Sequence, residues 1–220
     1  LLRNHSANGT RRQEPYCFKN KAAFAGILQL RYLLLPYLYS EYMKAALHDG
    51  MYCMPLAFAF PQDAFARQVE DEVMIGESLL IAPVYEQNAR GRYVYLPEEM
   101  LQVRVHCSQG NRIETSVLPA GHHYIPVALE EVVFFVRKGH MLPLAKGGRD
   151  IQTVSDVDFA DLRLFAYAPD GAAYTYYTDD GETKDYENPE HFVHITLDAK
   201  GTAQSDHAAV KVEAAPAPLS

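Results

Sequence analysis

The chain has 220 residues, of which 48% are hydrophobic and 22% are charged. This composition is typical of a folded protein with a buried core and excludes wholesale disorder. The length excludes a complete (β/α)8 barrel with further domains, since such barrels take about 250 residues. Twenty basic residues against 28 acidic ones give a net charge of −8. That balance argues against nucleic acid and against an anionic membrane as partners, and it suits a neutral substrate.

The chain opens at Leu1, in a run that reads as the middle of an element, and it shows no signal-peptide pattern. No apolar run approaches the roughly 18 residues of a membrane helix. Cys17, Cys53 and Cys107 are odd in number and widely spaced, so neither a disulfide framework nor a zinc pattern follows. We therefore expect three free thiols in a cytoplasmic protein, with no metal and no cofactor.

A polar segment, residues 1–19, precedes an expected helix. Asn20 is placed to cap it, and the apolar spacing that follows is helical. Pro36 must interrupt this helix because it lacks an N–H; residues 37–47 resume it and Gly50 ends it. The helix is apolar on most of its surface around residues 33–35 and has no evident partner, so we expect it to belong to a larger body and the chain to be the C-terminal part of a longer protein.

From about residue 54 the pattern becomes that of short strands separated by turn residues. The first expected block holds strands at residues 78–84, 91–96, 102–107, 122–129 and 132–137, and the second at residues 162–167, 173–178 and 192–197. Spacing near ten residues predicts antiparallel β-sandwiches. Gly147, Gly148 and Asp150 indicate a boundary, and the Ala/Pro-rich residues 208–220 are expected to form a flexible tail.

Two polar clusters could carry chemistry. His5, next to Arg3 on the first loop, could bind sugar hydroxyls or a carboxylate, although composition alone favours an ordinary solvated loop. Glu70, Asp71 and Glu72 form the densest acidic run. Glycoside hydrolysis needs two carboxylates that face each other, which consecutive residues do not, so a solvated face or a helix start is favoured.

The remaining motifs are weaker. His122 and His123 would point to opposite faces of a strand, and no third ligand stands at metal spacing. A nucleophile pair of His106 and Cys107 lacks an orienting partner. Asp180-Gly181 between strands predicts a tight hairpin turn. Fifteen tyrosines and no tryptophan could stack on sugars, but core and sheet positions are the favoured interpretation.

Several segments, in order along the chain, resemble glycoside hydrolase family 31. The run RNH at residues 3–5 resembles the family's loop near the end of its barrel. The run RYLLLPYLY at residues 31–39 resembles its last barrel helix. Its following segments resemble residues 55–63, GESLLIAPV at 76–84, RYVYLP at 92–97 and DDG at 179–181. Each match is weak alone, and their common order makes the set specific. One departure is Tyr16, where family members often have Trp.

The resemblance implies a mostly β chain: the last loop and helix of a TIM (β/α)8 barrel, followed by two antiparallel β-sandwich domains. The implied domains are residues 1–57 (barrel end), 58–146 (proximal sandwich), 147–207 (distal sandwich) and 208–220 (tail). The implied full-length enzyme is a retaining, exo-acting α-glucosidase, whose two catalytic aspartates lie upstream and match no residue here.

The resemblance also implies site residues and partners. His5 matches a histidine that binds glucose hydroxyls, and Arg3 matches an arginine beside the nucleophile. The implied partners are an oligosaccharide substrate, bound through the full-length enzyme, and the upstream barrel segment; the oligomeric state stays open. By itself the chain is expected to be inactive. The alternative function is a non-catalytic carbohydrate-binding or structural β-sandwich module.

Overall fold

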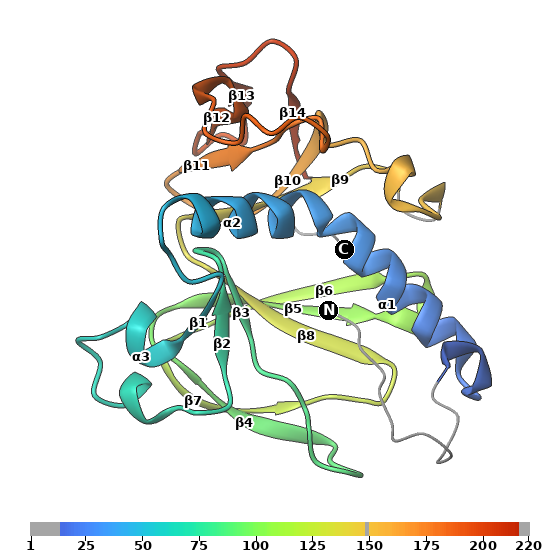
Figure 1. Cartoon of the computed structure of the whole chain (residues 1–220). Helices are drawn as coiled ribbons and strands as arrows, with labels where there is room; N and C mark the ends of the chain where they lie inside the picture. Colours follow the sequence, from blue (N-terminus) through green and yellow to red (C-terminus); the bar gives the residue numbers. More distant parts are fainter. Residues whose placement is uncertain (1–13, 148–149, 216–220) are drawn as a thin grey trace.

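The computed structural model describes residues 14–147 and 150–215, as helices and strands that form two β blocks around a helix pair (Figure 1). The helical segments are η1 (Pro15–Cys17), α1 (Lys21–Leu33), α2 (Leu35–Leu47), α3 (Leu56–Ala59), η2 (Ala66–Gln68), η3 (Cys107–Gln109), η5 (Val154–Asp156) and η6 (Pro189–His191). The strands are β1 (Cys53–Pro55), β2 (Val73–Ile75), β3 (Leu79–Ile81), β4 (Gly91–Leu96), β5 (Met100–His106), β6 (Arg112–Leu118), β7 (Gly121–Pro126), β8 (Glu131–Arg137), β9 (His140–Ala145), β10 (Asp161–Tyr167), β11 (Ala172–Tyr177), β12 (Phe192–Leu197), β13 (Ala203–Ser205) and β14 (Lys211–Ala214).

The predicted capped and interrupted helix is confirmed. The Asn20 side chain accepts a hydrogen bond from the Ala23 N–H at 3.2 Å, as an N-cap does. Pro36 lies in the first turn of α2, where the missing N–H costs nothing. Within the described residues no single helix is long and apolar enough to cross a membrane; α1 and α2 reach that threshold only together, across a 51° bend.

The first β block is a sandwich built on a six-stranded antiparallel sheet in the order β1-β2-β3-β8-β5-β6. One face packs against the two-stranded sheet β4–β7, and the other packs against the helices. In β8, Phe135 faces β4–β7, whereas Phe134 and Val136 face the helices. A central strand buried on both faces explains the continuous apolar run from Val132 to Val136.

The second β block consists of two three-stranded sheets, β14-β10-β9 and β11-β12-β13. β9 lies before the predicted boundary at residue 147, yet it pairs with β10 in this block. The chain changes sheets earlier, at the turn before β9, where Gly139 has a φ of +76° that favours glycine. β14 pairs with β10 in parallel, so the second block is not wholly antiparallel as expected.

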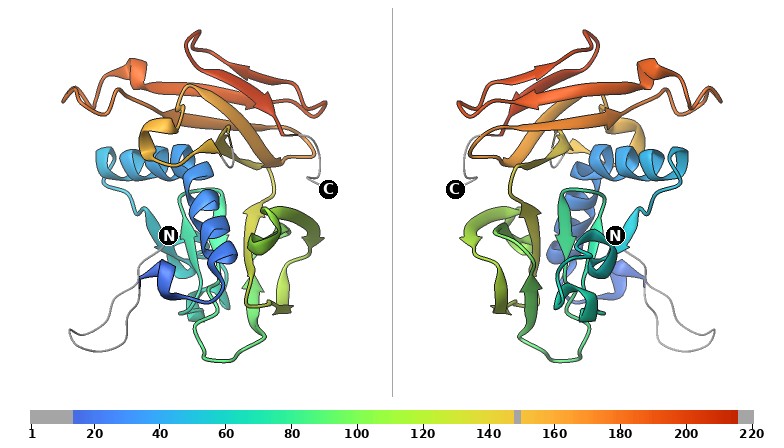
Figure 2. Two further views of the ribbon diagram at one scale, coloured as in Figure 1. Left: turned by 90° about the vertical axis from the view of Figure 1, so that its right-hand side faces the viewer. Right: turned by 90° about the vertical axis from the view of Figure 1, so that its left-hand side faces the viewer.

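Helix α2 lies between the two β blocks, in contrast to the expected absence of a partner (Figures 1 and 2). On one side the Tyr37 hydroxyl donates to the Ile75 carbonyl at 2.6 Å and accepts from the Ser78 N–H at 3.0 Å. On the other side the Ser40 hydroxyl accepts from the Tyr177 N–H of β11 at 2.9 Å. The helix thus joins both blocks into one continuous hydrophobic core.

Two further expectations were wrong. Residues 211–214, placed in a flexible tail, form β14, because Val210 beside them is buried in the core. The Asp180-Gly181 pair is not a tight hairpin turn. The β11–β12 connection runs from residue 178 to residue 191, and Asp179 within it accepts from the Tyr39 hydroxyl of α2 at 2.9 Å.

Candidate functional site

The sequence-predicted site residues Arg3 and His5 lie outside the described residues. The segment that follows them is described from Glu14 and leads into α1. There the Asn20 amide donates to Glu130, in the loop between β7 and β8, and the rings of Phe18 and Phe24 stack at 4.7 Å. The described chain therefore begins beside the first β block.

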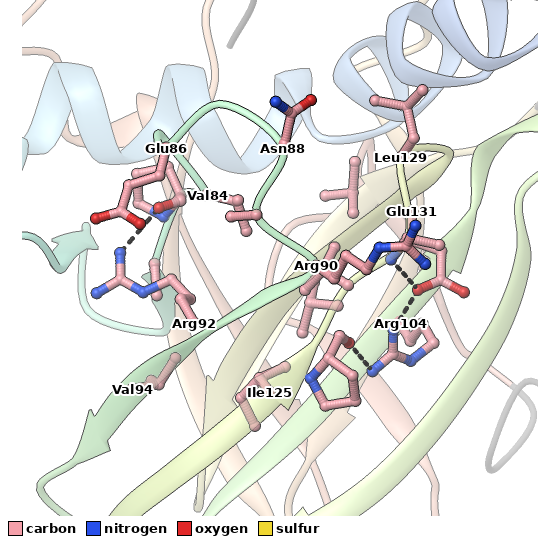
Figure 3. Close-up of a pocket in the computed structure, with 18 of the residues that line it drawn as sticks. Val84, Glu86, Asn88, Arg90, Arg92, Val94, Arg104, Ile125, Leu129 and Glu131 are labelled. Atoms are coloured by element: carbon pink, nitrogen blue, oxygen red, sulfur yellow. Dashed lines mark hydrogen bonds and ion pairs between the residues drawn. The ribbon is translucent and has the colours of Figure 1, made fainter.

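A cleft among the described residues has a volume of about 1380 Å³ and lies within the first β block. Its walls come from the loop between β3 and β4 and from the end of β7 with the start of β8. Figure 3 shows Glu86 and Arg92 on one side, Arg90, Arg104 and Glu131 on the other. The floor is apolar, with Val94, Ile125 and Phe135.

Two arginines and one glutamate of the cleft are held by partners in the protein, namely Arg92, Arg104 and Glu131. The Arg104 guanidinium pairs with Glu131 and donates to the Pro126 carbonyl at 2.7 Å. The Arg92 guanidinium pairs with Asp71 at 2.7 Å and donates to the Pro83 carbonyl at 2.8 Å. These bonds brace the two walls.

Glu131 cannot serve as a proton donor at neutral pH. Burial by itself would raise its pKa, but the Ala128 N–H and the Arg104 guanidinium together hold the pKa below its ordinary value. Glycoside hydrolysis needs a carboxylic acid whose pKa is raised, facing a second carboxylate. Glu131 is therefore not suited to be the acid of a glycosidase.

The prediction that the acidic run of residues 70–72 is solvated is wrong for Glu72. Glu70 and Asp71 are exposed, but Glu72 is only 6% exposed. One carboxylate oxygen accepts from the Tyr95 N–H at 2.7 Å, and the other has no hydrogen-bond partner in the described structure. Burial raises the pKa of Glu72 to about 7. Such a pKa suits a general acid, but a carboxyl group enclosed in this way cannot reach a substrate.

Glu72 makes the stability of the chain depend on pH. The folded chain keeps its proton up to about pH 7, whereas the unfolded chain releases it near the ordinary pKa of 4.5. Between these values the unfolded state binds fewer protons, so the free energy of unfolding falls as the pH rises. The Glu72→Gln variant is expected to match the wild type near pH 5 and to exceed it by about 2 kcal/mol at pH 8. Urea unfolding at both pH values checks this.

The exposed neighbour supplies the control for this prediction. The Glu70→Gln variant should follow the wild type at both pH values, because Glu70 is exposed. A Glu72→Gln variant that gained no stability between pH 5 and pH 8 would contradict a protonated Glu72 in the folded chain.

The described residues offer no group of three or more His, Cys, Asp or Glu side chains placed to hold a metal ion. His122 contacts the rings of Phe65 and Tyr95, whereas the ring of His123 lies 2.8 Å from the Pro119 carbonyl. The two histidines therefore lie in different surroundings and do not act together. Cys107 is buried, and burial raises the pKa of its thiol to about 11, which makes it a poor nucleophile.

Two family profiles match the chain in sequence order. The profile described as the glycosyl hydrolases family 31 TIM-barrel domain matches residues 1–41, and the one described as the glycosyl hydrolase family 31 C-terminal domain matches residues 50–142. Together they cover the loop, the helix pair and the first β block.

Relatives of known sequence and structure agree with these profiles. Alpha-glucosidase 2 of Bacillus thermoamyloliquefaciens is 29% identical over 92% of this chain, and the 1,6-alpha-glucosyltransferase of Sporosarcina globispora is 32% identical over 87%. The chain spans only 26% and 15% of their lengths. A dextranase of Flavobacterium johnsoniae shares the fold over 90% of this chain and 24% of its own, with a TM-score of 0.71 and 21% identity.

The mostly β architecture with a β-sandwich after the helix pair, the order of the two profile matches and the relatives that span the chain all agree with the resemblance in the sequence. The chain belongs to glycoside hydrolase family 31, of which it carries the end of the barrel domain and the C-terminal β domains.

Proposed function

We propose that this chain is the C-terminal part of a retaining, exo-acting α-glucosidase that removes terminal α-linked glucose from oligosaccharides. The observation that carries the proposal is the order of the two profile matches, barrel end followed by C-terminal domain. The names of the relatives, which include an alpha-glucosidase and a 1,6-alpha-glucosyltransferase, support α-linked glucose as the substrate class.

In this proposal the chemistry takes place on the upstream barrel. One aspartate attacks the anomeric carbon and forms a covalent glucosyl-enzyme, while the second carboxyl group protonates the leaving oxygen and then activates water.

The chain's own contribution is to bind and to position. His5 is proposed to donate or accept hydrogen bonds with glucose hydroxyls, and Arg3 to orient the nucleophile through charge-assisted hydrogen bonds. The β blocks hold α2 in place through Tyr37 and Ser40, and the Asn111 amide of the first block donates to the Gly26 carbonyl of α1 at 3.0 Å.

The experiment compares the longer protein with the 220-residue chain for release of glucose from maltose and isomaltose. The longer protein should be active and the chain alone should not. In the longer protein, His5→Ala should lower kcat/KM by about tenfold to a hundredfold, as expected for lost hydrogen bonds to a neutral substrate.

The histidine variant needs a matched control. His194 lies exposed on β12 of the second block, so His194→Ala should leave kcat/KM unchanged. Turnover by the chain alone that is abolished by changing one of its acidic residues would refute the proposal, as would a longer protein that cleaves no α-glucoside.

A further inference from the structure

The outer face of the two-stranded sheet β4–β7 carries a row of aromatic side chains. We call it the aromatic strip; its members are Phe65, Tyr93, Tyr95, His122 and Tyr124. It arises from the alternation of the strands, since Val94, Leu96 and Ile125 point into the core of the sandwich. The residues between them must therefore point outward.

The pairing of the two strands brings the rings together. Tyr93 lies opposite Tyr124, and Tyr95 lies opposite His122. The ring centroids are 5.2 Å apart in the first pair and 4.8 Å apart in the second. Phe65 extends the row, at 5.8 Å from Tyr95 and 5.5 Å from His122. These separations are those of favourable aromatic contacts, so the strip is held in place before any ligand arrives.

The strip is nevertheless open to solvent. Tyr93 is 73% exposed, Phe65 59% and Tyr124 53%. Within the described structure the hydroxyls of Tyr93 and Tyr124 make no hydrogen bond, whereas the Tyr95 hydroxyl donates to Asp63 at 2.6 Å. Exposed aromatic rings and free hydroxyls therefore lie side by side, with an anchored carboxylate beside them.

The chemistry of the strip selects a neutral ligand with apolar faces and hydroxyl groups. The C–H faces of a pyranose ring lie well against the negative face of an aromatic ring, and its hydroxyls can bond to phenol and carboxylate oxygens. Single-stranded nucleic acid also stacks on aromatic rings, but it needs cations along its backbone. Arg67 interacts with Asp63 beside the strip, but the five strip residues form no row of cations, and the chain carries a net charge of −8.

A protein partner fits less well. Protein interfaces place tyrosine at their centres, but among other apolar side chains. The exposed members of the strip are all aromatic, and Tyr93 and Tyr124 carry hydroxyls with no partner in the described chain. We propose that the aromatic strip binds a chain of α-linked glucose units. That it is an α-glucan rather than another neutral glycan rests on the proposed function.

The test is affinity electrophoresis of the 220-residue chain in native gels that contain glycogen, dextran or no polysaccharide. The wild type should be retarded by at least one of the two glucans. The Tyr93→Ala/Tyr124→Ala double variant should bind about tenfold more weakly, because stacking on each ring contributes substantially. Both side chains are exposed, so the variant should fold, which circular dichroism and urea unfolding verify.

Tyr186→Ala provides the matched control, since Tyr186 is also exposed but lies in the connection between β11 and β12. It should be retarded like the wild type. Absence of retardation in both glucans, or equal retardation of the double variant, would overturn the proposal. So would a wild-type dimer that dissociates in the double variant, because the strip would then be a contact between copies.

The outcome does not depend on catalysis. Binding by this chain requires none of the upstream carboxylates, so a longer protein that hydrolyses maltose while the strip binds no glucan would refute the strip alone. Retardation by glucan together with a longer protein that is inactive on α-glucosides would refute only the proposed hydrolysis.

Discussion

Replacement of Gly76 by alanine is expected to lower the free energy of unfolding by about 3–4 kcal/mol. Gly76 lies in the turn between β2 and β3 with a φ of +63°, a conformation that an L-residue adopts at a cost of about 1 kcal/mol. A Cβ atom at this position would also overlap the side chain of Glu41 on α2. Both effects act together in the variant.

Glu41 has no room to move away from the new methyl group. Its carboxylate accepts from the Tyr174 hydroxyl at 2.6 Å and from the Glu77 N–H at 3.0 Å, and it pairs with Lys44 at 2.5 Å. A shift of this side chain would leave buried polar groups without partners, which costs about 1–3 kcal/mol for each group. The overlap therefore adds substantially to the cost of the backbone conformation.

Gly181 separates the two contributions. It has a φ of +72°, and no atom lies within 4 Å of a Cβ placed there. Gly181→Ala should cost only about 1 kcal/mol, from the backbone alone. Urea unfolding of both variants with linear extrapolation measures the difference. Equal losses in the two variants would show that α2 can move away from the β2–β3 turn.

The helices and most strands could be predicted because their signals are local. The Asn20 cap, the break at Pro36 and the alternation at Gly91–Leu96 each depend on a few neighbouring residues, and each predicted element is present. Six strands of the described structure were not predicted: β1, β2, β6, β9, β13 and β14. For β6 and β14 the pairing partner supplies the pattern that their own residues lack, since β6 is mostly exposed and β14 depends on β10.

The features that matter for the site depend on contacts distant in sequence. Glu72 is buried by β4, more than 20 residues away, so its neighbours Glu70 and Asp71 gave no hint of its environment. The aromatic strip was visible in part, because Tyr93 and Tyr95 alternate with Val94 and Leu96. Its second half required the register of β4 against β7, which places Tyr124 opposite Tyr93.

The roles of Arg3 and His5 could be inferred only from the family resemblance. No periodicity distinguishes His5 from a histidine on an ordinary loop, and the proposed function places the carboxylates that it would serve outside this chain. In contrast, the junction of α2 with both β blocks follows from described contacts alone. That junction yields the second large expected effect.

Replacement of Glu41 by alanine is expected to cost about 3–5 kcal/mol, the loss typical of removing one partner of a buried ion pair. Glu41 is 6% exposed, and its carboxylate contacts Lys44 of its own helix, the Glu77 N–H of the first block and the Tyr174 hydroxyl of the second. All three donors would lose this acceptor. Burial and the charge of Glu41 raise the pKa of Tyr174 well above its ordinary value, so this hydroxyl stays a donor throughout the accessible pH range.

Two comparisons show whether the loss reflects this junction. Glu213→Ala removes the ion pairs of a half-exposed carboxylate with Arg163 and Lys146 and should cost less than about 1 kcal/mol. The losses of unfolding free energy in Glu41→Ala and Tyr174→Phe should not add in the double variant. Each substitution removes the same hydrogen bond, which the Tyr174 hydroxyl donates to Glu41. Urea unfolding of the two single variants and the double variant gives this coupling energy. If the two effects were additive, the carboxylate would not join the two β blocks through Tyr174, and the hydrogen bonds of Tyr37 and Ser40 together with the hydrophobic contacts of α2 would hold the helix in place.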